Sequence, residues 1–593
     1  YRSAVLIAKA ATERGLVFPS AYFPVPDMIP EALPVSRALA LSIARRESEF
    51  DPEARSPAGA LGLMQMLPAT AAEVAKDQGI KFSKAKLASD PAYNATLGAA
   101  YLKELVDQFG PSVALVASGY NAGPGRPRGW VDAFGDPRLA STDVDGAGFG
   151  HYTAQDYDEL ADCPVEMGRF WNGQFTAGGV EHRFVISGAG AWLDGERLID
   201  DTRRICETQI AFWHGDGAPP FSNYVFMLHA SGDGYGGLEH RNSTALICQR
   251  ADLPRLRPSA SDKPAALKAT DGYTTLLGLI SHEYFHTWNV KRLRPAEFAR
   301  YDYAQENYTQ LLWFFEGFTS YYDDLLLRRA ALLDHGGYLK LLTKTINQVL
   351  QTPGRLVQTV AQASFDAWVK YYRQDENTPN ATVSYYTKGA LVALCLDLTL
   401  RREGRTTLDA VLRSLWQRCA GGPMDEATLR AVLHELGGRP FDAELDAWVH
   451  STAELPLEEL LGAHGISVKR EDAPTAQRLG LRVSETGAVQ IKTVLRGGLA
   501  EQAGMAAGDE WIGIEAQGQG WRIGKLDDIA LYAGTEKAVT ALVARDRRLL
   551  RLPLALEWPA PTGRKRGAGR PAADTISLGV TDAAQAARWL DAR

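Results

Sequence analysis

Two histidines and a glutamate in the short sequence from His282 to His286, HEYFH, could bind and use a metal ion. Histidines four residues apart on a helix project from one face, with Cβ atoms about 6 Å apart, so both can hold one ion. Neutral imidazole is a good zinc ligand. Glu283 follows the first histidine, and there its carboxylate can take a proton from a water molecule beside the metal. The alternative is a surface helix that contains this pattern by accident.

A third ligand is expected from the next long apolar segment, residues 308–333. Catalytic zinc takes three protein ligands and keeps a water, whereas structural zinc is usually closed by four. Glu316 lies in the middle of that segment, next to the aromatic residues Trp313, Phe314, Phe315 and Phe318. A buried carboxylate is unfavourable unless it is paired or bound to metal. The alternative is a helix-edge glutamate paired with an arginine, but we predict that His282, His286 and Glu316 bind one zinc ion.

The elements that position these residues are predicted to be helices. Residues 279–293 contain neither glycine nor proline, and TTLLGLI leads into the motif with apolar spacing. The whole chain has 593 residues, of which 45% are hydrophobic and 23% charged, which predicts a globular protein of about four domains. A net charge of −7 gives no case for nucleic-acid binding. No apolar run is long enough to span a membrane.

The ends and cysteines of the chain are less informative. The sequence begins with Tyr1, so we expect a processed, trimmed or partial chain in which no export signal is visible. The five cysteines are scattered, form no CxxC pattern and say little about the redox compartment.

Residues 1–137 have helical periodicity and four short motifs in order. These are Arg45-Arg46-Glu47-Ser48, the segment 56–65 (SPAGALGLMQ), Pro68-Ala69-Thr70 and the segment 119–125 (GYNAGPG). They resemble the soluble lytic transglycosylase family, whose catalytic domain is lysozyme-like. The resemblance makes Glu47 the acid and then the base, with the sugar's 6-hydroxyl attacking to give an anhydro product. Burial would raise its pKa for this work. Met64, Gln65, Tyr120 and Asn121 would shape the cleft. The alternative is an exposed helix glutamate beside Arg46.

Residues 152–593 resemble the glycyl-aminopeptidase family of gluzincins that carry a C-terminal PDZ domain. The resemblance rests on GGLEHRNS (236–243), HEYFHTWNVKRLRP (282–295), LLWFFEGFTSYYDDL (311–325) and SYYTKGALVALCLDL (384–398), in that order. It implies that Glu239 binds the substrate's α-amino group and that Gly237 and Leu238 are also substrate-binding residues. Tyr386 would donate a hydrogen bond to the oxyanion, worth about 3 kcal/mol, although the neighbouring Tyr385 is the alternative.

These resemblances predict a multidomain α+β protein. We expect a lysozyme-like domain without its C-terminal part at 1–137, a linker at 138–151 and a remnant of an N-terminal β-domain at 152–190. A thermolysin-like zinc domain at 191–336, a helical subdomain at 337–462, a PDZ domain at 463–557 and a tail at 558–593 would follow. In the PDZ domain, Leu479-Gly480-Leu481 would bind a peptide carboxylate, or the domain would have only a packing role. The basic tract 563–570 is expected to be a solvated linker.

Three functions are consistent with the sequence. The favoured one is a zinc aminopeptidase that prefers small N-terminal residues. The second is peptidoglycan cleavage through Glu47, in a natural fusion or an artefactual join. The third is a non-catalytic scaffold that binds cell wall and peptides. A peptidoglycan target would imply the periplasm or cell envelope, with the cytoplasm as the alternative.

Overall fold

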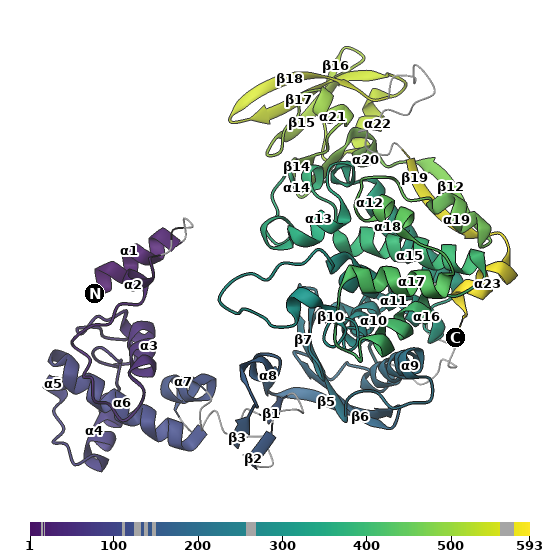
Figure 1. The fold of residues 1–593 in the computed structure, drawn as a ribbon. Coiled ribbons are helices and arrows are strands. Elements are labelled where there is room, and N and C mark those ends of the chain that lie inside the picture. The colour runs from purple at the N-terminus through teal and green to yellow at the C-terminus, as the bar shows by residue number, and fades with distance from the viewer. Residues whose placement is uncertain are drawn as a thin grey trace. The chain divides into compact units, whose positions relative to one another are not determined.

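The structure, a computed structural model, describes residues 1–12, 16, 18–109, 113–123, 132–135, 140–144, 150–256, 269–557 and 574–592. The chain divides into two compact units, many of whose elements are labelled in Figure 1. The N-terminal unit comprises Tyr1–Leu160 with Val165–Phe170, and the C-terminal unit comprises Ala161–Pro164 with Trp171–Arg593. Among the described helices, none combines the length and the hydrophobicity needed to cross a bilayer.

The N-terminal unit is helical up to residue 122, as its periodicity predicts. Its helix α3 begins where the Ser36 hydroxyl accepts a hydrogen bond from the Leu39 backbone N–H (3.3 Å), and it ends at Glu49, whose φ is 53°. The fully buried Leu63, Met64 and Leu102 belong to its core. The helices are α1 (Arg2–Thr12), α2 (Pro19–Tyr22), α3 (Arg37–Ser48), α4 (Pro68–Asp77), α5 (Lys84–Ser89), α6 (Pro91–Phe109) and α7 (Val113–Ala122).

Short strands occupy the region that we expected to be a linker. Strand β2 (Ala140–Val144) pairs with β3 (Gly150–Thr153), and β1 (Asp132–Gly135) pairs with β4 (Val165–Gly168), both antiparallel, with α8 (Tyr157–Ala161) before β4. Of the residues expected to form a linker, 140–144 and 150–151 lie in strands, so the described part of this segment has regular structure.

A five-stranded sheet forms one side of the C-terminal unit. Its order is β5 (Phe170–Ala177), β6 (Val180–Ser187), β7 (Asn223–Ser231), β9 (Ser243–Gln249) and β8 (Gly236–Glu239), so that β8 is an edge strand. Helix α9 (Gly195–His214) connects β6 to the parallel strand β7. The predicted boundary at residue 190 therefore cuts through one sheet, because β6 and β7 are a β–α–β pair that local patterns do not reveal.

Helices pack on this sheet and continue its core. The central ones are α10 (Asp271–Phe285), α11 (Leu312–Arg329) and α15 (Tyr385–Glu403). Helices α11 and α15 approach closely at Gly317 and Gly389, where a Cβ on Gly317 would lie 2.5 Å from the Gly389 Cα. The other helices are α12 (His335–Leu350), α13 (Val360–Phe365), α14 (Thr378–Ala381), α16 (Leu408–Arg418), α17 (Glu426–Gly437), α18 (Asp442–Trp448) and α19 (Leu457–Ala463).

Short elements connect these helices. They are the 3₁₀ turns η2 (Arg250–Asp252), η3 (Ala296–Phe298) and η4 (Pro353–Leu356), the π-turn η5 (Ala367–Tyr371), and the parallel pair β10 (Arg294–Pro295) and β11 (Pro423–Met424).

The region after residue 473 forms a second sheet with its own core around Trp511. The sheet has the order β13 (Leu481–Ser484), β14 (Val489–Val494), β15 (Glu510–Ala516), β17 (Ala538–Arg545) and β18 (Arg548–Ala555), and β16 (Gln519–Arg522) pairs with β15. Helices α20 (Thr475–Leu479), α21 (Leu499–Gln502) and α22 (Asp527–Ala533) accompany it.

The C-terminal segment is part of the fold rather than a tail. Strand β19 (Asp574–Val580) pairs with β12 (Ile466–Asp472), which the predicted boundary had given to the PDZ domain. Helix α23 (Ala583–Leu590) buries Trp589, whose indole N–H donates to the Tyr321 hydroxyl (2.9 Å). Pairing over about a hundred residues of sequence leaves no local signal, which explains the wrong prediction. The basic tract 563–570 lies outside the described residues.

Candidate metal centre

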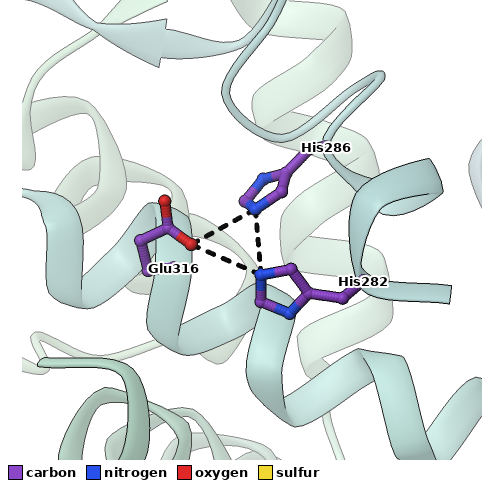
Figure 2. Close-up of side chains that lie close together, drawn as sticks. All are labelled: His282, His286 and Glu316. Atoms are coloured by element: carbon purple, nitrogen blue, oxygen red, sulfur yellow. Dashed lines mark hydrogen bonds and ion pairs between the residues drawn. The ribbon is translucent and has the colours of Figure 1, made fainter. Parts of the chain in front are cut away.

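The residues predicted to bind zinc converge in the C-terminal unit. His282 lies in the last turn of α10, His286 follows its end, and Glu316 comes from α11 (Figure 2). The two histidine Nε2 atoms are 3.1 Å apart, and the Glu316 Oε2 lies 3.4 Å from His282 and 3.2 Å from His286. All three ligand atoms lie within 4.8 Å of one another. Two imidazoles and one carboxylate are the ligand set of a catalytic metal with an open position.

Neighbouring groups fix the orientation of both histidines. The Nδ1 of His282 lies 3.0 Å from the Asp323 carboxylate, and the Nδ1 of His286 lies 2.6 Å from the Asn289 carbonyl. Both partners are acceptors, so each Nδ1 carries a hydrogen, and each Nε2 faces Glu316, where it can offer its lone pair to a metal ion once it has released its own proton. Sequence reasoning missed Asp323. It follows Glu316 by seven residues, two helical turns along the same face, and that spacing was the available signal.

The electrostatics of the centre favour a cation. Burial acts to raise the pKa of Glu316, but the charge of His286 and hydrogen bonds from both histidines hold it at about 2. Against the effect of burial, Asp323 and Glu316 raise the pKa of His282. Glu316 is therefore ionised, and the pocket attracts positive charge. The three donors fit a divalent metal that accepts nitrogen and oxygen ligands.

Glu283 is buried beside the metal ligands and faces the edge strand β8. It is 4% exposed, and its Oε2 has no hydrogen-bond partner in the described structure. Burial raises its pKa to about 7; the charge of His282 opposes the rise and that of Glu239 adds to it. A Cβ at Gly237 would lie only 2.1 Å from the Glu283 Oε1. A glycine at this position therefore lets the carboxylate lie against the strand.

Strand β8 brings two of its three predicted residues to this side. Alternate residues of a strand face the same way, so Gly237 and Glu239 share a face and Leu238 points to the other. Leu238 is 58% exposed. Its role in substrate binding stays a prediction. Tyr235, which we did not predict, precedes the strand and is 61% exposed.

Two tyrosines at the start of α15 differ in their surroundings. The Tyr386 ring stacks near His282, with ring centroids 6.2 Å apart, and its hydroxyl lies 3.5 Å from that of Tyr372. Burial and the charge of Glu316 raise the pKa of Tyr386, so it stays a hydrogen-bond donor. Tyr385 is 1% exposed and packs on Tyr371. In the structure, Tyr386 is the one with a ring contact to His282, a predicted metal ligand.

The predicted transglycosylase residues are only partly assembled. Glu47 lies in the last turn of α3, where burial raises its pKa and Arg46 opposes the rise. Burial, together with the nearby charge of Glu47, raises the pKa of Tyr120, whose hydroxyl donates to the Met64 carbonyl (2.9 Å). Tyr120 thus lies close enough to Glu47 for the carboxylate charge to affect its hydroxyl.

Two other predicted cleft residues make contacts within the fold. The Met64 side chain is fully buried in the core, so it does not shape an open cleft. The Gln65 amide donates to the carbonyls of Ala54 (3.0 Å) and Gly62 (2.8 Å), and so stabilises its own loop. Asn121 is exposed, one residue after Tyr120.

The loop predicted to bind a carboxylate closes α20 and opens β13. Gly480 has a φ of 75° and lies against Gly498, since a Cβ at Gly480 would meet the Gly498 Cα at 2.8 Å. Leu479 and Leu481 on either side are buried, at 1% and 4% exposure. Nearby, the Asn380 side chain accepts from the Arg496 N–H (2.8 Å) and donates to the Val494 carbonyl (2.9 Å). The second sheet is therefore tied to the segment just before α15.

Comparison with known proteins agrees with both halves of this description. Residues 275–392 match the M61 glycyl aminopeptidase family, and residues 29–138 match the transglycosylase SLT domain. The crystal structure of an aminopeptidase N family protein from Idiomarina loihiensis is similar, with 33% sequence identity and a TM-score of 0.69. That match covers 78% of this chain and 77% of the other.

Relatives of the N-terminal part are soluble lytic murein transglycosylases. Those from Escherichia coli strain K12 and Salmonella typhimurium are 37% and 36% identical over 115 residues, which is 19% of this chain. The matched segment spans only 18% of each of these relatives. Since the match to the aminopeptidase covers most of both chains and the metal centre lies within the matched family segment, the protein belongs to the M61 glycyl aminopeptidase family and carries a transglycosylase SLT segment in its N-terminal part.

Proposed function

We propose that the C-terminal unit is a zinc-dependent aminopeptidase of the gluzincin type that removes small N-terminal residues, glycine or alanine, from peptides. The observation that supports this best is the convergence of His282, His286 and Glu316 beside the buried Glu283. These three ligands would hold the zinc ion. Bound zinc would polarise the scissile carbonyl and make the attacking water more acidic.

The protein's own groups would share the remaining work. Glu283, with a pKa of about 7, is suited to accept the proton of the attacking water and return it to the leaving amine at neutral pH. Glu239 would bind the α-amino group and so restrict the enzyme to the first peptide bond. The exposed edge of β8 can pair with the extended peptide. Tyr386 would donate its hydroxyl hydrogen to the developing oxyanion.

Hydrolysis of glycyl-4-nitroanilide by the purified full chain tests this function. We expect release of nitroaniline that a chelator stops and added zinc restores, and that Glu283→Gln lacks. Glu207→Gln, on the surface of α9 and paired with Arg203, is the matched control and should keep full activity. Bound zinc without hydrolysis of glycyl or alanyl substrates would contradict the proposal. That result would favour the alternative of a non-catalytic scaffold.

A second proposed activity is peptidoglycan cleavage by the N-terminal unit. The SLT match and the raised pKa of the half-buried Glu47 support it. Glu47 would protonate the glycosidic oxygen and then take the proton of the sugar's attacking 6-hydroxyl. Release of anhydro-muropeptides from purified cell wall, lost in Glu47→Gln and kept in the exposed Glu53→Gln, is the expected result. Equal release by wild type and Glu47→Gln would show that this unit does not cleave glycan.

The proposed partners follow from these activities. Peptides and peptidoglycan would be the substrates, at the periplasm or cell envelope. We assign the second sheet to a PDZ domain that binds a C-terminal peptide at Leu479-Gly480-Leu481. The alternative is a packing role, to which the buried leucines and the Asn380 contacts would equally be suited.

A further inference from the structure

Lys388 is a buried lysine whose ammonium makes no hydrogen bond or ion pair in the described structure. It lies in the first turn of α15 and is only 3% exposed. Lysine is almost never buried unless it is paired, and its ammonium offers three N–H donors. A buried polar group without a partner calls for an explanation such as an unseen water or ion.

The side chain lines a small cavity of about 30 Å³. Arg355 and Glu454 also line it, together with apolar side chains that include Leu391 and Leu455. A cavity must offer about 10–15 Å³ to hold one water molecule. This cavity therefore has room for one or two water molecules or for an ion of similar size, but not for a phosphate or the end of a peptide.

The charges around the cavity do not balance. Arg355 is 9% exposed, and its Nε donates to the Glu454 carboxylate at 3.2 Å. The Glu454 side chain is 56% exposed, so solvent screens its charge. Burial lowers the pKa of Lys388 to about 8, and Glu454 opposes the shift, so the lysine is still mostly charged at pH 7. Two buried cations therefore face one exposed carboxylate, and the cavity carries excess positive charge.

We propose that this cavity binds one small monovalent anion of the size of chloride, held by Lys388 and Arg355. Water could fill the space but would leave the excess positive charge uncompensated. An anion would both fill the space and compensate that charge. Residues two apart on a helix do not face each other, so Lys388 points away from the face of Tyr386. The anion site is therefore separate from the metal centre.

The anion would join three segments that meet at the start of α15. Arg355 lies in η4, Glu454 precedes α19, and Lys388 belongs to α15 itself. The turn η4 packs directly on the chain just before α15, since a Cβ at Gly354 would lie 2.0 Å from the Thr382 carbonyl oxygen. Binding would thus hold the helix start that carries Tyr386, without contact with the reacting groups.

Thermal unfolding of the full chain at constant ionic strength tests this site without using peptidase activity. Replacing sodium gluconate with sodium chloride at pH 7 should raise the unfolding midpoint by roughly 2–4 °C in a saturable way. Lys388→Met keeps the length of the side chain and removes the charge, so it should lack this rise. Lys340→Met, which removes a lysine 69% exposed, should keep it. In wild-type crystals soaked in bromide, anomalous scattering should locate the ion beside the Lys388 Nζ.

Two outcomes would overturn the inference. One is a midpoint that responds equally to chloride and gluconate, and the other is a Lys388→Met variant that keeps the full chloride response. Crystals without bromide in the cavity would overturn it even if the variant failed to fold.

Discussion

The metal centre and the Glu47 site differ in how many segments each requires. The candidate metal centre, with the residues proposed to act beside it, draws on β8, α10, α11 and α15, and each histidine has a fixed partner on its second ring nitrogen. Around Glu47, the described structure shows one half-buried carboxylate near Tyr120, while Met64 and Gln65 serve the core and their own loop.

The two sites differ in the number of segments because metal binding and general acid catalysis need different arrangements of residues. A metal needs several ligands at fixed positions, so the fold must bring distant segments together. A single general acid needs mainly a raised pKa, which burial of one glutamate supplies. The metal centre should therefore be sensitive to many substitutions in distant segments, and the Glu47 site to few.

The largest expected effect separates the two sites directly. Glu283→Gln removes the proton acceptor but leaves all three metal ligands, so glycyl anilide hydrolysis should fall by about 10³-fold. Zinc content, measured by atomic absorption, should stay at one ion per chain, and release of anhydro-muropeptides should be unchanged. A loss of both activities would mean that the two sites are not independent.

A backbone contact gives the next largest effect. In Gly237→Ala the new Cβ would lie 2.1 Å from the Glu283 Oε1 and must displace that carboxylate. A displacement of about 1 Å can cost about 10²-fold in rate, and kcat for the glycyl anilide should fall by that factor. Gly236→Ala is the matched control, because nothing lies within 4 Å of its added Cβ. Equal activity of the two variants would refute the importance of this contact.

How far the sequence predicted this site depends on the distance between its parts. One short sequence pattern contains His282, Glu283 and His286. Glu316 stands out as a carboxylate in an aromatic segment. Each of these signals can be read from neighbouring residues alone. The contact of Gly237 with Glu283 and that of Asp323 with His282 join separate elements. Which residues meet in these two contacts is determined by the packing of separate elements, and the periodicity of the sequence does not encode that packing.

The same limit applies to the fold. Helices of the N-terminal unit were predicted from their own periodicity. The pairing of β6 with β7 across α9, and that of β12 with β19 at the C-terminus, join strands distant in sequence. The boundary at 190 and the tail were therefore assigned wrongly.

A smaller effect tests the hydrogen bond between Asp323 and His282. Asp323→Ala removes the acceptor at the His282 Nδ1, so the ring loses its fixed tautomer and orientation. Zinc affinity should fall by about 10–100-fold, measured by competition with a chromogenic chelator. Asp200→Asn, on the surface of α9 and paired with Arg203, should bind zinc like wild type. Unchanged affinity in Asp323→Ala would mean that packing alone orients His282. Chelators should not affect glycan cleavage through Glu47.

The smallest expected effect is a difference in acid sensitivity. His182 is fully buried in β6 between the Val180 carbonyl (3.0 Å) and the Tyr284 hydroxyl (2.8 Å), and burial lowers its pKa from 6.5 to about 4. Between pH 4 and 6.5, the unfolded chain binds more protons at His182 than the folded chain does. The contribution of His182 to the free energy of unfolding is therefore fully present above pH 6.5 and declines as pH falls toward 4. The N-terminal helices contain no histidine, since the first in the chain is His151. In the N-terminal helices, the raised pKa of Glu47 has the opposite effect on stability, because it favours the folded state as pH falls.

Urea unfolding of wild type and His182→Gln at pH 7.0, 6.5, 6.0 and 5.5 measures this contribution. Glutamine can still accept a hydrogen bond from Tyr284 but does not titrate. The free energy of unfolding of the C-terminal unit should fall with pH more steeply in wild type than in the variant, by about 1 kcal/mol between pH 6.5 and 5.5. Fluorescence reports on this unit, because Trp213, Trp288 and Trp313 lie in its core. Parallel pH dependences would show that His182 titrates equally in the folded and unfolded chains, and that the acid sensitivity of this unit arises elsewhere.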